Sequence, residues 1–203
     1  MSETGVVKFR CEHVAAEIAA FPDFDAINVC RRKLLQLGMI GVDAHGIGYG
    51  NVSVRAGDAH EFYITGSGTG GCTELSLKQF AKVTAYDFQR NCLRCTGGTI
   101  ASSESLTHAA VYESEPRACA VIHCHDGPIW AHLLQRGLAT LPQVEYGTPE
   151  MAFEVQRLFR EATEPKQQIF AMAGHVDGVV AFGHDVEEAF QMLTREHAHA
   201  RSS

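Results

Sequence analysis

Six stretches of the chain carry apolar and polar residues in an order that predicts helices, most clearly where apolar side chains return every three or four residues. Over residues 25–37, for example, Ile27, Cys30 and Leu34 fall on one face. Asp185 precedes the last stretch, and aspartate commonly caps helices because its carboxylate accepts backbone N–H bonds. The predicted helices cover residues 12–20, 25–37, 105–113, 127–135, 149–161 and 185–198.

Short apolar or alternating runs between these stretches predict strands. Residues 51–55 (NVSVR) alternate and form a predicted hairpin with residues 61–65, while residues 77–95 fit either structure and we favour strands there. One α/β domain over residues 1–203, with a largely antiparallel sheet, is therefore expected. Further predicted strands cover residues 118–122, 168–172 and 178–183.

Two loops are rich in glycine, at residues 41–50 (GVDAHGIGYG) and 66–71 (GSGTGG). Neither has the spacing of a dinucleotide fingerprint or the Lys-Ser/Thr ending of a P-loop. Glycine lets backbone N–H groups approach an oxyanion closely, so these loops are candidates for an anion site. They are equally well explained as surface turns.

Composition narrows the class of protein. The 203 residues have a net charge of -7 and no basic cluster, which argues against nucleic acid and anionic membrane surfaces as partners. No apolar run approaches the roughly 20 residues that span a bilayer, and the N-terminus lacks the apolar core of a signal peptide. The seven cysteines are scattered and odd in number, which favours reduced thiols in a cytoplasmic protein.

Candidate chemistry gathers in residues 101–125, where a predicted strand ends in His123, Cys124 and His125. Side chains two positions apart on an extended backbone point to the same side, so both imidazoles can share one cation while Cys124 packs on the other side. Zinc in catalytic sites commonly takes three protein ligands and leaves one position open. Alternatively, the two histidines end the strand and hydrogen-bond nearby carbonyl groups.

Ser102, Ser103 and Glu104 precede the helix predicted for residues 105–113. Serine before a helix is a capping signature, but a helix start also offers unpaired N–H groups to an anion. The serines therefore either cap the helix or bind a phosphate while Glu104 faces the metal. A carboxylate beside a metal-bound substrate can transfer a proton.

A further histidine, His175, lies between the last two predicted strands. It can join His123 and His125 only if those strands lie close to the strand that carries the pair. It is equally well explained as a solvated turn residue.

Four segments, in this order, resemble the class II aldolase/adducin family: GNVSVR at 50–55, ITGSG at 64–68, SSE at 102–104 and VIHCH at 121–125. Their rough spacing matches as well, and the similarity extends over residues 28–196. The resemblance implies a three-layer α/β/α fold around an antiparallel sheet. It also implies a homotetramer with active sites between the subunits.

The same resemblance implies the chemistry of the site. Zinc, or another divalent metal such as Mn²⁺ or Co²⁺, would be held by three histidines, and His123 and His125 match the first two. Glu104 occupies the position of the catalytic acid/base. The phosphate of a small sugar-phosphate-like substrate would be bound by Asn51, Thr65, Gly66, Ser102 and Ser103.

The third metal ligand departs from the family pattern. The sequence GHVDG at 174–178 replaces the usual His-His-Gly or His-Gly, and an ungapped match puts Asp177 at the ligand position. A small bulge would bring in His175, two residues earlier. We expect His175 to be the ligand, with Asp177 as the alternative.

The implied reaction is that of a lyase, a metal-dependent aldolase that breaks the C3–C4 bond of a phosphorylated hydroxy-ketone through an enediolate. Glu104 favours an aldolase over the pentose-phosphate 4-epimerases, which typically have aspartate there, whereas Thr107, His108 and residues 129–131 are more epimerase-like. An epimerase or dehydratase, or a non-catalytic adducin-like scaffold, are the alternatives. The segment between the second and third ligands is shorter than in sugar-phosphate aldolases, and Tyr146 is a candidate acid there.

Overall fold

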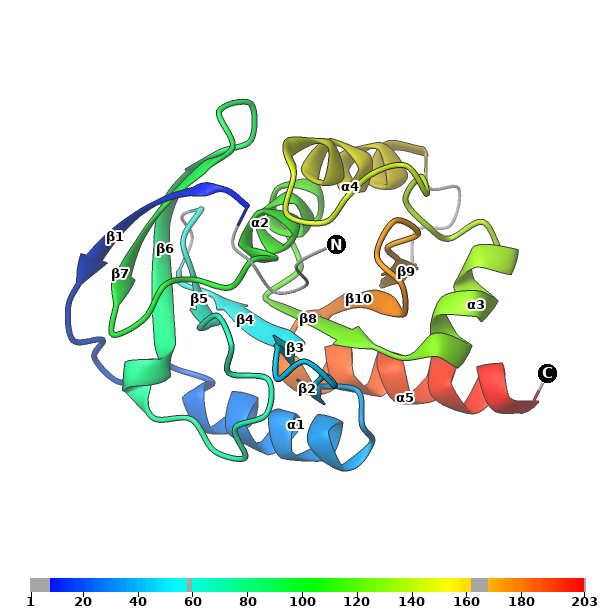
Figure 1. Ribbon diagram of the computed structural model, residues 1–203, viewed down its shortest axis with the longest axis horizontal. Coiled ribbons are helices and arrows are strands. Elements are labelled where there is room, and N and C mark those ends of the chain that lie inside the picture. The colour runs from blue at the N-terminus through cyan, green and yellow to red at the C-terminus, as the bar shows by residue number, and fades with distance from the viewer. Residues whose placement is uncertain (1–7, 58–59, 162–167, 203) are drawn as a thin grey trace.

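The computed structural model describes residues 8–57, 60–161 and 168–202. The strands of the main sheet are β1 (Arg10–Ala15), β4 (Asn51–Arg55), β5 (Phe62–Thr65), β6 (Phe80–Asp87), β7 (Cys92–Gly97), β8 (Ala120–His125), β9 (Ile169–Ala171) and β10 (Gly178–Gly183). Their order is β1-β7-β6-β5-β4-β8-β10-β9 (Figure 1). Every neighbouring pair is antiparallel except β1 and β7, which confirms the largely antiparallel sheet expected from the sequence.

Helices cover both faces of this sheet. They are α1 (Phe24–Gln36), α2 (Ser105–Ser114), α3 (Gly127–Gln135), α4 (Pro149–Glu161) and α5 (Val186–Ser202), with a short 3-10 helix η1 (Leu77–Gln79) before β6. On one face, Val121 of β8 packs with Leu106 of α2 and Met151 of α4. On the other face, Ile122 of β8 belongs to the core that α1, α3 and α5 complete. The three-layer α/β/α fold expected from the sequence is therefore confirmed (Figure 1).

Strand β8 lies inside the sheet, between β4 and β10. In the register of the sheet, His123 pairs with Asn51 of β4 and with Val180 of β10, and His125 pairs with Gly178. Cys124 belongs to the core on the α1 and α5 side. Because side chains alternate along a strand, the two histidines lie toward the opposite face, as the spacing predicts.

Glycine is required immediately before β4. The φ angle of Gly50 is 81°, and a Cβ atom at this position would lie 2.3 Å from Cγ2 of Ile40. A side chain would be strained by both the backbone conformation and the contact. Directly after this glycine, Asn51 begins β4 and pairs with His123 of β8.

The helix predicted for residues 12–20 is wrong. Residues 10–15 form β1, an edge strand that pairs in parallel with β7, and residues 16–20 have no regular structure. Phe9 is buried and Cys11 and His13 are half-buried, whereas Glu12 and Val14 are exposed, so the burial repeats every two residues. The alanines that follow in the sequence obscured this alternation.

The ends of two helices clarify what their flanking residues do. Asp185 accepts a hydrogen bond of 2.8 Å from the backbone N–H of Glu188, which confirms it as the cap of α5. At α2, by contrast, Glu104 is the residue that precedes the helix, and it makes no capping hydrogen bond with its side chain. Across the ranges that the structure describes, no helix is long and apolar enough to cross a membrane.

Candidate active site

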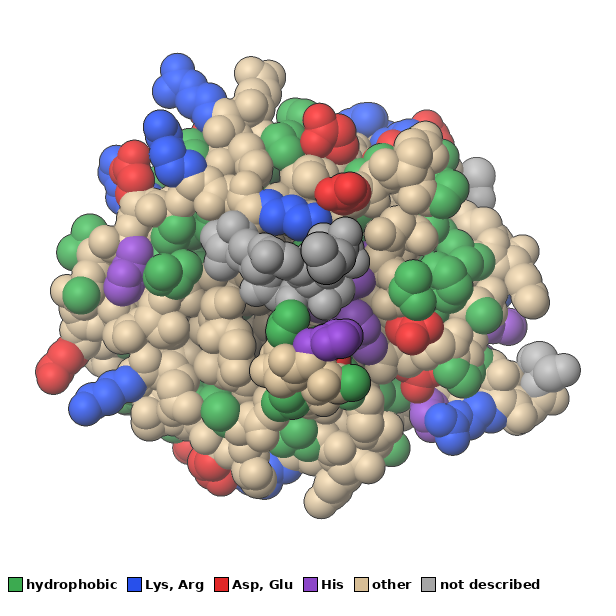
Figure 2. Space-filling view, in the orientation of Figure 1, with side chains coloured by type: hydrophobic (Ala, Val, Ile, Leu, Met, Phe, Trp, Pro, Cys, Tyr) green, Lys and Arg blue, Asp and Glu red, His purple; other side chains and the backbone are tan. Residues whose placement is uncertain are grey.

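A pocket of about 1140 Å³ opens where β8 ends, between the start of α2 and the turn that joins β9 to β10. Both glycine-rich loops contribute to its lining, through the short hairpin of β2 (Gly41–Val42) and β3 (Gly48–Tyr49) and through Gly66 and Gly68. Histidine side chains gather near the middle of this face of the molecule (Figure 2). The pocket therefore collects segments that lie far apart in the sequence.

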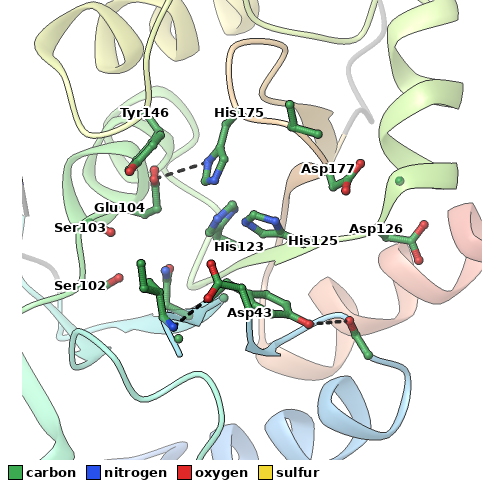
Figure 3. Close-up of a pocket in the computed structure, with 18 of the residues that line it drawn as sticks. Asp43, Ser102, Ser103, Glu104, His123, His125, Asp126, Tyr146, His175 and Asp177 are labelled. Atoms are coloured by element: carbon green, nitrogen blue, oxygen red, sulfur yellow. Dashed lines mark hydrogen bonds and ion pairs between the residues drawn. The ribbon is translucent and has the colours of Figure 1, made fainter. Parts of the chain in front are cut away.

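Three histidines meet in this pocket, His123 and His125 from β8 and His175 from the turn before β10 (Figure 3). One ligand atom from each of them lies within 4.8 Å of the others. The ring centroids are 5.2 Å apart for His123 and His125, 5.2 Å for His123 and His175, and 4.7 Å for His125 and His175. The antiparallel pairing of β10 with β8 produces this arrangement, because it returns the chain to the end of β8.

The chemical state of these rings suits a metal ligand. Nδ1 of His123 lies 3.2 Å from the carbonyl oxygen of Val179, so donation of its proton there leaves Nε2 free to bind a cation. Burial lowers the pKa of His123 well below its ordinary value and lowers the pKa of His175 to about 3, so both rings are neutral, as ligands must be. Nδ1 of His175 is buried and has no hydrogen-bond partner among the described residues. A cation would satisfy donor atoms of this kind, and three nitrogen donors fit zinc.

Asp177, the alternative third ligand, lies outside this cluster. Its carboxylate points away from the imidazoles in Figure 3, and Oδ1 lies 3.0 Å from the position that a Cβ atom on Gly127 would take. Its φ angle of 62° gives the turn a left-handed residue just before β10. This turn is the local irregularity that carries His175, instead of Asp177, to the other two histidines.

Glu104 lies next to the histidine cluster. Its Oε1 atom is 3.8 Å from Nδ1 of His175 and has no hydrogen-bond partner among the described residues, while Oε2 accepts a 2.8 Å hydrogen bond from the hydroxyl of Thr107. The side chain is only 2% exposed, and this burial raises the pKa of the carboxyl group to about 7, against the opposing effects of Thr107 and Lys8. A carboxyl group in such an environment can exchange a proton near neutral pH.

The residues predicted to bind a phosphate have different surroundings. Asn51, Gly66, Ser102 and Ser103 line the pocket, and the buried Oδ1 atom of Asn51 has no hydrogen-bond partner in the described part of the chain. Thr65 is fully buried and is not among the lining residues, and its hydroxyl accepts a hydrogen bond of 3.2 Å from the backbone N–H of Val52. The structure thus brings four of these five residues to the pocket.

Sequence reasoning missed several residues that line the pocket. Tyr49 lies beside His125, with 5.1 Å between the ring centroids, and Asp43 belongs to the same hairpin region. Lys8 reaches the pocket from the segment before β1, and its ammonium lies 3.9 Å from the ring centroid of Tyr146. The glycine-rich composition of residues 41–50 was the one available signal, whereas nothing in the sequence singled out Lys8.

Comparison with known proteins adds to this geometry. Residues 32–201 match the family model described as the class II aldolase and adducin N-terminal domain. No protein with a curated function matches the chain significantly.

Solved structures share the fold. An L-fuculose 1-phosphate aldolase superposes with a TM-score of 0.66 at 19% sequence identity, covering 91% of this chain and 85% of that one. YgbL from Klebsiella pneumoniae, a candidate aldolase/epimerase/decarboxylase, superposes with a TM-score of 0.66 at 22% sequence identity, covering 88% of this chain and 86% of that one. A sugar-phosphate aldolase from Thermotoga maritima superposes with a TM-score of 0.65 at 17% sequence identity, covering 88% of this chain and 91% of that one. At these identities the comparison establishes the architecture, and the chemistry has to be argued from the site.

Proposed function

The chain belongs to the class II aldolase and adducin family, and on that premise we propose that it is a metal-dependent aldolase that cleaves a small, phosphorylated hydroxy-ketone. The observation that carries this proposal is the buried carboxylate of Glu104, 3.8 Å from one ring of a three-histidine cluster at the base of a pocket. Burying polar groups without hydrogen-bond partners costs stability, and proteins accept that cost mainly at functional sites. A scaffold protein has no need of a buried carboxyl group beside three imidazoles.

His123, His125 and His175 are the residues that would hold the divalent ion, and zinc is the metal that three nitrogen donors with an open position favour. Mn²⁺ and Co²⁺ are the alternatives. The ion would supply positive charge that stabilises negative charge developing on the substrate oxygens when the carbon–carbon bond breaks. Val179 orients His123 through its carbonyl oxygen, which keeps Nε2 available to the ion.

Glu104 is proposed to carry the proton. In the cleavage direction the C4 hydroxyl group loses its proton to water in the pocket, the C3–C4 bond breaks so that C4 becomes the carbonyl carbon of the aldehyde, and the electron pair of that bond remains on C3 of the ketose fragment. Glu104 in its protonated form then gives a proton to that carbon, and in the synthesis direction its carboxylate removes the same proton. Thr107 fixes the orientation of the carboxyl group by donating a hydrogen bond to Oε2, so Oε1 is the atom left to face the pocket.

The phosphate is proposed to bind at the start of α2. Ser102 and Ser103 lie in the pocket wall just before this ten-residue helix, whose first N–H groups favour an anion. Gly66 lies beside them because of the isolated bridge between Gly66 and Ala101. Asn51, from β4, completes this side of the pocket and has a buried amide oxygen with no partner among the described residues. Thr65 supports this wall through the backbone of Val52 and is assigned no direct contact with the substrate.

Family membership is also the basis for proposing that the protein works as a homotetramer in the cytoplasm, with residues of a neighbouring subunit closing the pocket. Sedimentation velocity on the metal-loaded protein tests this assembly. A species with four times the mass of the chain is expected, and a monomer that retains activity contradicts the proposal.

The function is tested by incubating the zinc-loaded protein with a panel of ketose 1-phosphates and measuring release of the aldehyde and of dihydroxyacetone phosphate. Cleavage of at least one member supports the aldolase. Inversion of a hydroxyl group without cleavage identifies an epimerase, and loss of water identifies a dehydratase, with the same site in both cases. A protein that binds less than about a tenth of a zinc ion per chain and turns over nothing is a scaffold.

A further inference from the structure

Lys8 is held in a defined place although it precedes the residues that match the family. Its neighbour Phe9 is buried in the core that α2 and α4 cover. Its carbonyl oxygen accepts a 3.1 Å hydrogen bond from the side-chain amide of Asn91, in the turn between β6 and β7, and the carbonyl of Asn91 accepts a 2.9 Å bond from Arg10. These contacts fix the backbone of Lys8 at the edge of the pocket before the chain enters β1.

The ammonium group of Lys8 extends over the pocket from this anchor. It lies 3.9 Å from the ring centroid of Tyr146, and that ring stacks on His175 with 4.4 Å between the centroids. Its ion pair with Glu145, at 3.2 Å, involves a carboxylate side chain that is 73% exposed. Exposed pairs of this kind contribute little stability, so an anion that enters the pocket can replace Glu145 as the partner of the ammonium.

The charge of the pocket gives this lysine its importance. Among the described residues, the lining contains five carboxylates, from Asp43, Glu104, Asp126, Glu145 and Asp177, and two side chains with a permanent positive charge, from Lys8 and Arg201. These carboxylates repel a dianionic phosphate, and a cation on the side of the pocket where the phosphate binds, in addition to the divalent ion at the histidines, reduces that repulsion.

Lys8 also lies next to the serine segment. A Cβ atom at Gly147 would be 3.4 Å from the carbonyl oxygen of Ser103 and 3.6 Å from Cβ of Lys8, so both residues border the same space beside this glycine. The first turn of α2 and the lysine therefore form adjoining parts of one wall. Together they offer hydrogen-bond donors and a full positive charge, the combination that phosphate sites use.

We propose that Lys8 binds the phosphate group of the substrate and makes the pocket selective for phosphorylated over unphosphorylated ketoses. The inference rests on the proposed function and deepens it by naming the residue that discriminates the substrate class. Lys8 precedes β1 and lies outside residues 32–201, so this part of the phosphate site comes from a segment that the family model does not match.

The first test measures binding of inorganic phosphate to the zinc-loaded protein by calorimetry, which needs no turnover. Lys8→Met keeps the length and apolar stem of the side chain over Tyr146 and removes the charge, and Lys8→Arg restores a cation. Lys33→Met is the matched control, because Lys33 also forms a 3.2 Å ion pair, with Glu187, and lies 4.9 Å from the ring centroid of Phe190, away from the pocket. Melting temperature and zinc content verify that each variant is folded and loaded.

Lys8→Met should weaken phosphate binding about tenfold or more, while Lys8→Arg and Lys33→Met stay within about threefold of the wild type. If Lys33→Met weakens phosphate binding as much as Lys8→Met does, the effect is one of overall charge and the proposal is overturned. Unchanged binding in Lys8→Met, or a wild-type protein that binds no phosphate at all, would also overturn it.

The second test compares KM for a ketose 1-phosphate that the wild type cleaves with KM for the unphosphorylated ketose. Lys8→Met should raise the first by about tenfold or more, leave the second within about twofold, and change kcat little, since uniform binding is lost. If both proteins cleave the substrates and the ratio of the two KM values is the same in Lys8→Met as in the wild type, the role of Lys8 is overturned and the aldolase proposal stands. Phosphate binding that depends on Lys8, with no cleavage of any ketose, rejects the aldolase and leaves the lysine site standing.

Discussion

Oε1 of Glu104 lies 3.8 Å from Nδ1 of His175, and both atoms are buried without a hydrogen-bond partner among the described residues. The two residues come from different elements, the segment before α2 and the turn before β10. Antiparallel pairing of β10 with β8 brings them together on the face that α2 covers. The candidate metal centre and the candidate acid/base are therefore adjacent because of the sheet topology.

Removal of any one of the three imidazoles should weaken metal binding. His123→Ala, His125→Ala and His175→Ala are each expected to retain less than about a tenth of an ion per chain after zinc loading and desalting, because two nitrogen donors hold the ion too weakly. Asp177→Ala should retain about one ion, since its carboxylate lies toward Gly127. Metal analysis by mass spectrometry checks both expectations. If His175→Ala retains zinc and Asp177→Ala loses it, Asp177 and not His175 is the third ligand.

Glu104→Gln should separate metal binding from catalysis. Glutamine keeps the shape of the side chain and the contact with Thr107, but it cannot exchange a proton. Turnover in the retro-aldol assay is expected to fall about a hundredfold or more, the scale for losing a general acid/base, with zinc content unchanged. Turnover equal to that of the wild type would remove Glu104 from the mechanism.

Gly50→Ala should destabilise the fold more than Gly57→Ala. Both glycines have a positive φ angle, 81° and 71°, so alanine is strained by its backbone at either position. Only at Gly50 would the new Cβ also overlap Ile40, at 2.3 Å, whereas Gly57 has open space. The free energy of unfolding, measured with urea, is expected to fall by at least about 1 kcal/mol more for Gly50→Ala. Equal losses would mean that Ile40 can move aside.

Acid should destabilise the metal-free protein partly through His108. This ring is fully buried, with Nδ1 2.7 Å from the hydroxyl of Ser53, and burial lowers its pKa to about 3. The pKa in the folded state lies below the unfolded value of about 6.5, so the unfolded chain takes up the proton first as the pH falls. The stability that the neutral ring contributes is complete above about pH 6.5 and is lost progressively toward pH 3.

His108→Asn keeps a polar atom near Ser53 and has no titrating group. Between pH 7.5 and pH 5.0, the wild type should lose about 2 kcal/mol more of its free energy of unfolding than this variant does. Urea unfolding at both pH values in the presence of a chelator checks the difference. Equal losses in the two proteins would show that His108 is accessible to protons in the folded state.

Much of the fold follows from local sequence. The strand over β8 is predicted by the small and β-branched residues 118–122, and the helix α4 by its apolar spacing, because buried faces impose these patterns. The helix prediction for residues 12–20 was wrong because β1 is an edge strand. Most of its surface is exposed, so few of its positions are constrained to be apolar. Its place is set by pairing with β7, about eighty positions away, and such pairing leaves little local signal.

The candidate site divides in the same way. His123 and His125 are adjacent on one strand, so their shared direction follows from the spacing alone. His175 joins them only through the pairing of β8 with β10, and no local rule decides between it and Asp177. Lys8 reaches the pocket through a parallel strand pair and a side-chain contact with Asn91, both of which depend on the tertiary fold.

The most direct measurement is anomalous X-ray diffraction at the zinc edge from a crystal of the zinc-loaded protein. One peak is expected among His123, His125 and His175, with a nitrogen of each ring about 2.0–2.1 Å from it and the Glu104 carboxyl group beside it. Absence of a peak among the three rings, or a peak at another set of ligands, would contradict the metal centre and the aldolase chemistry built on it.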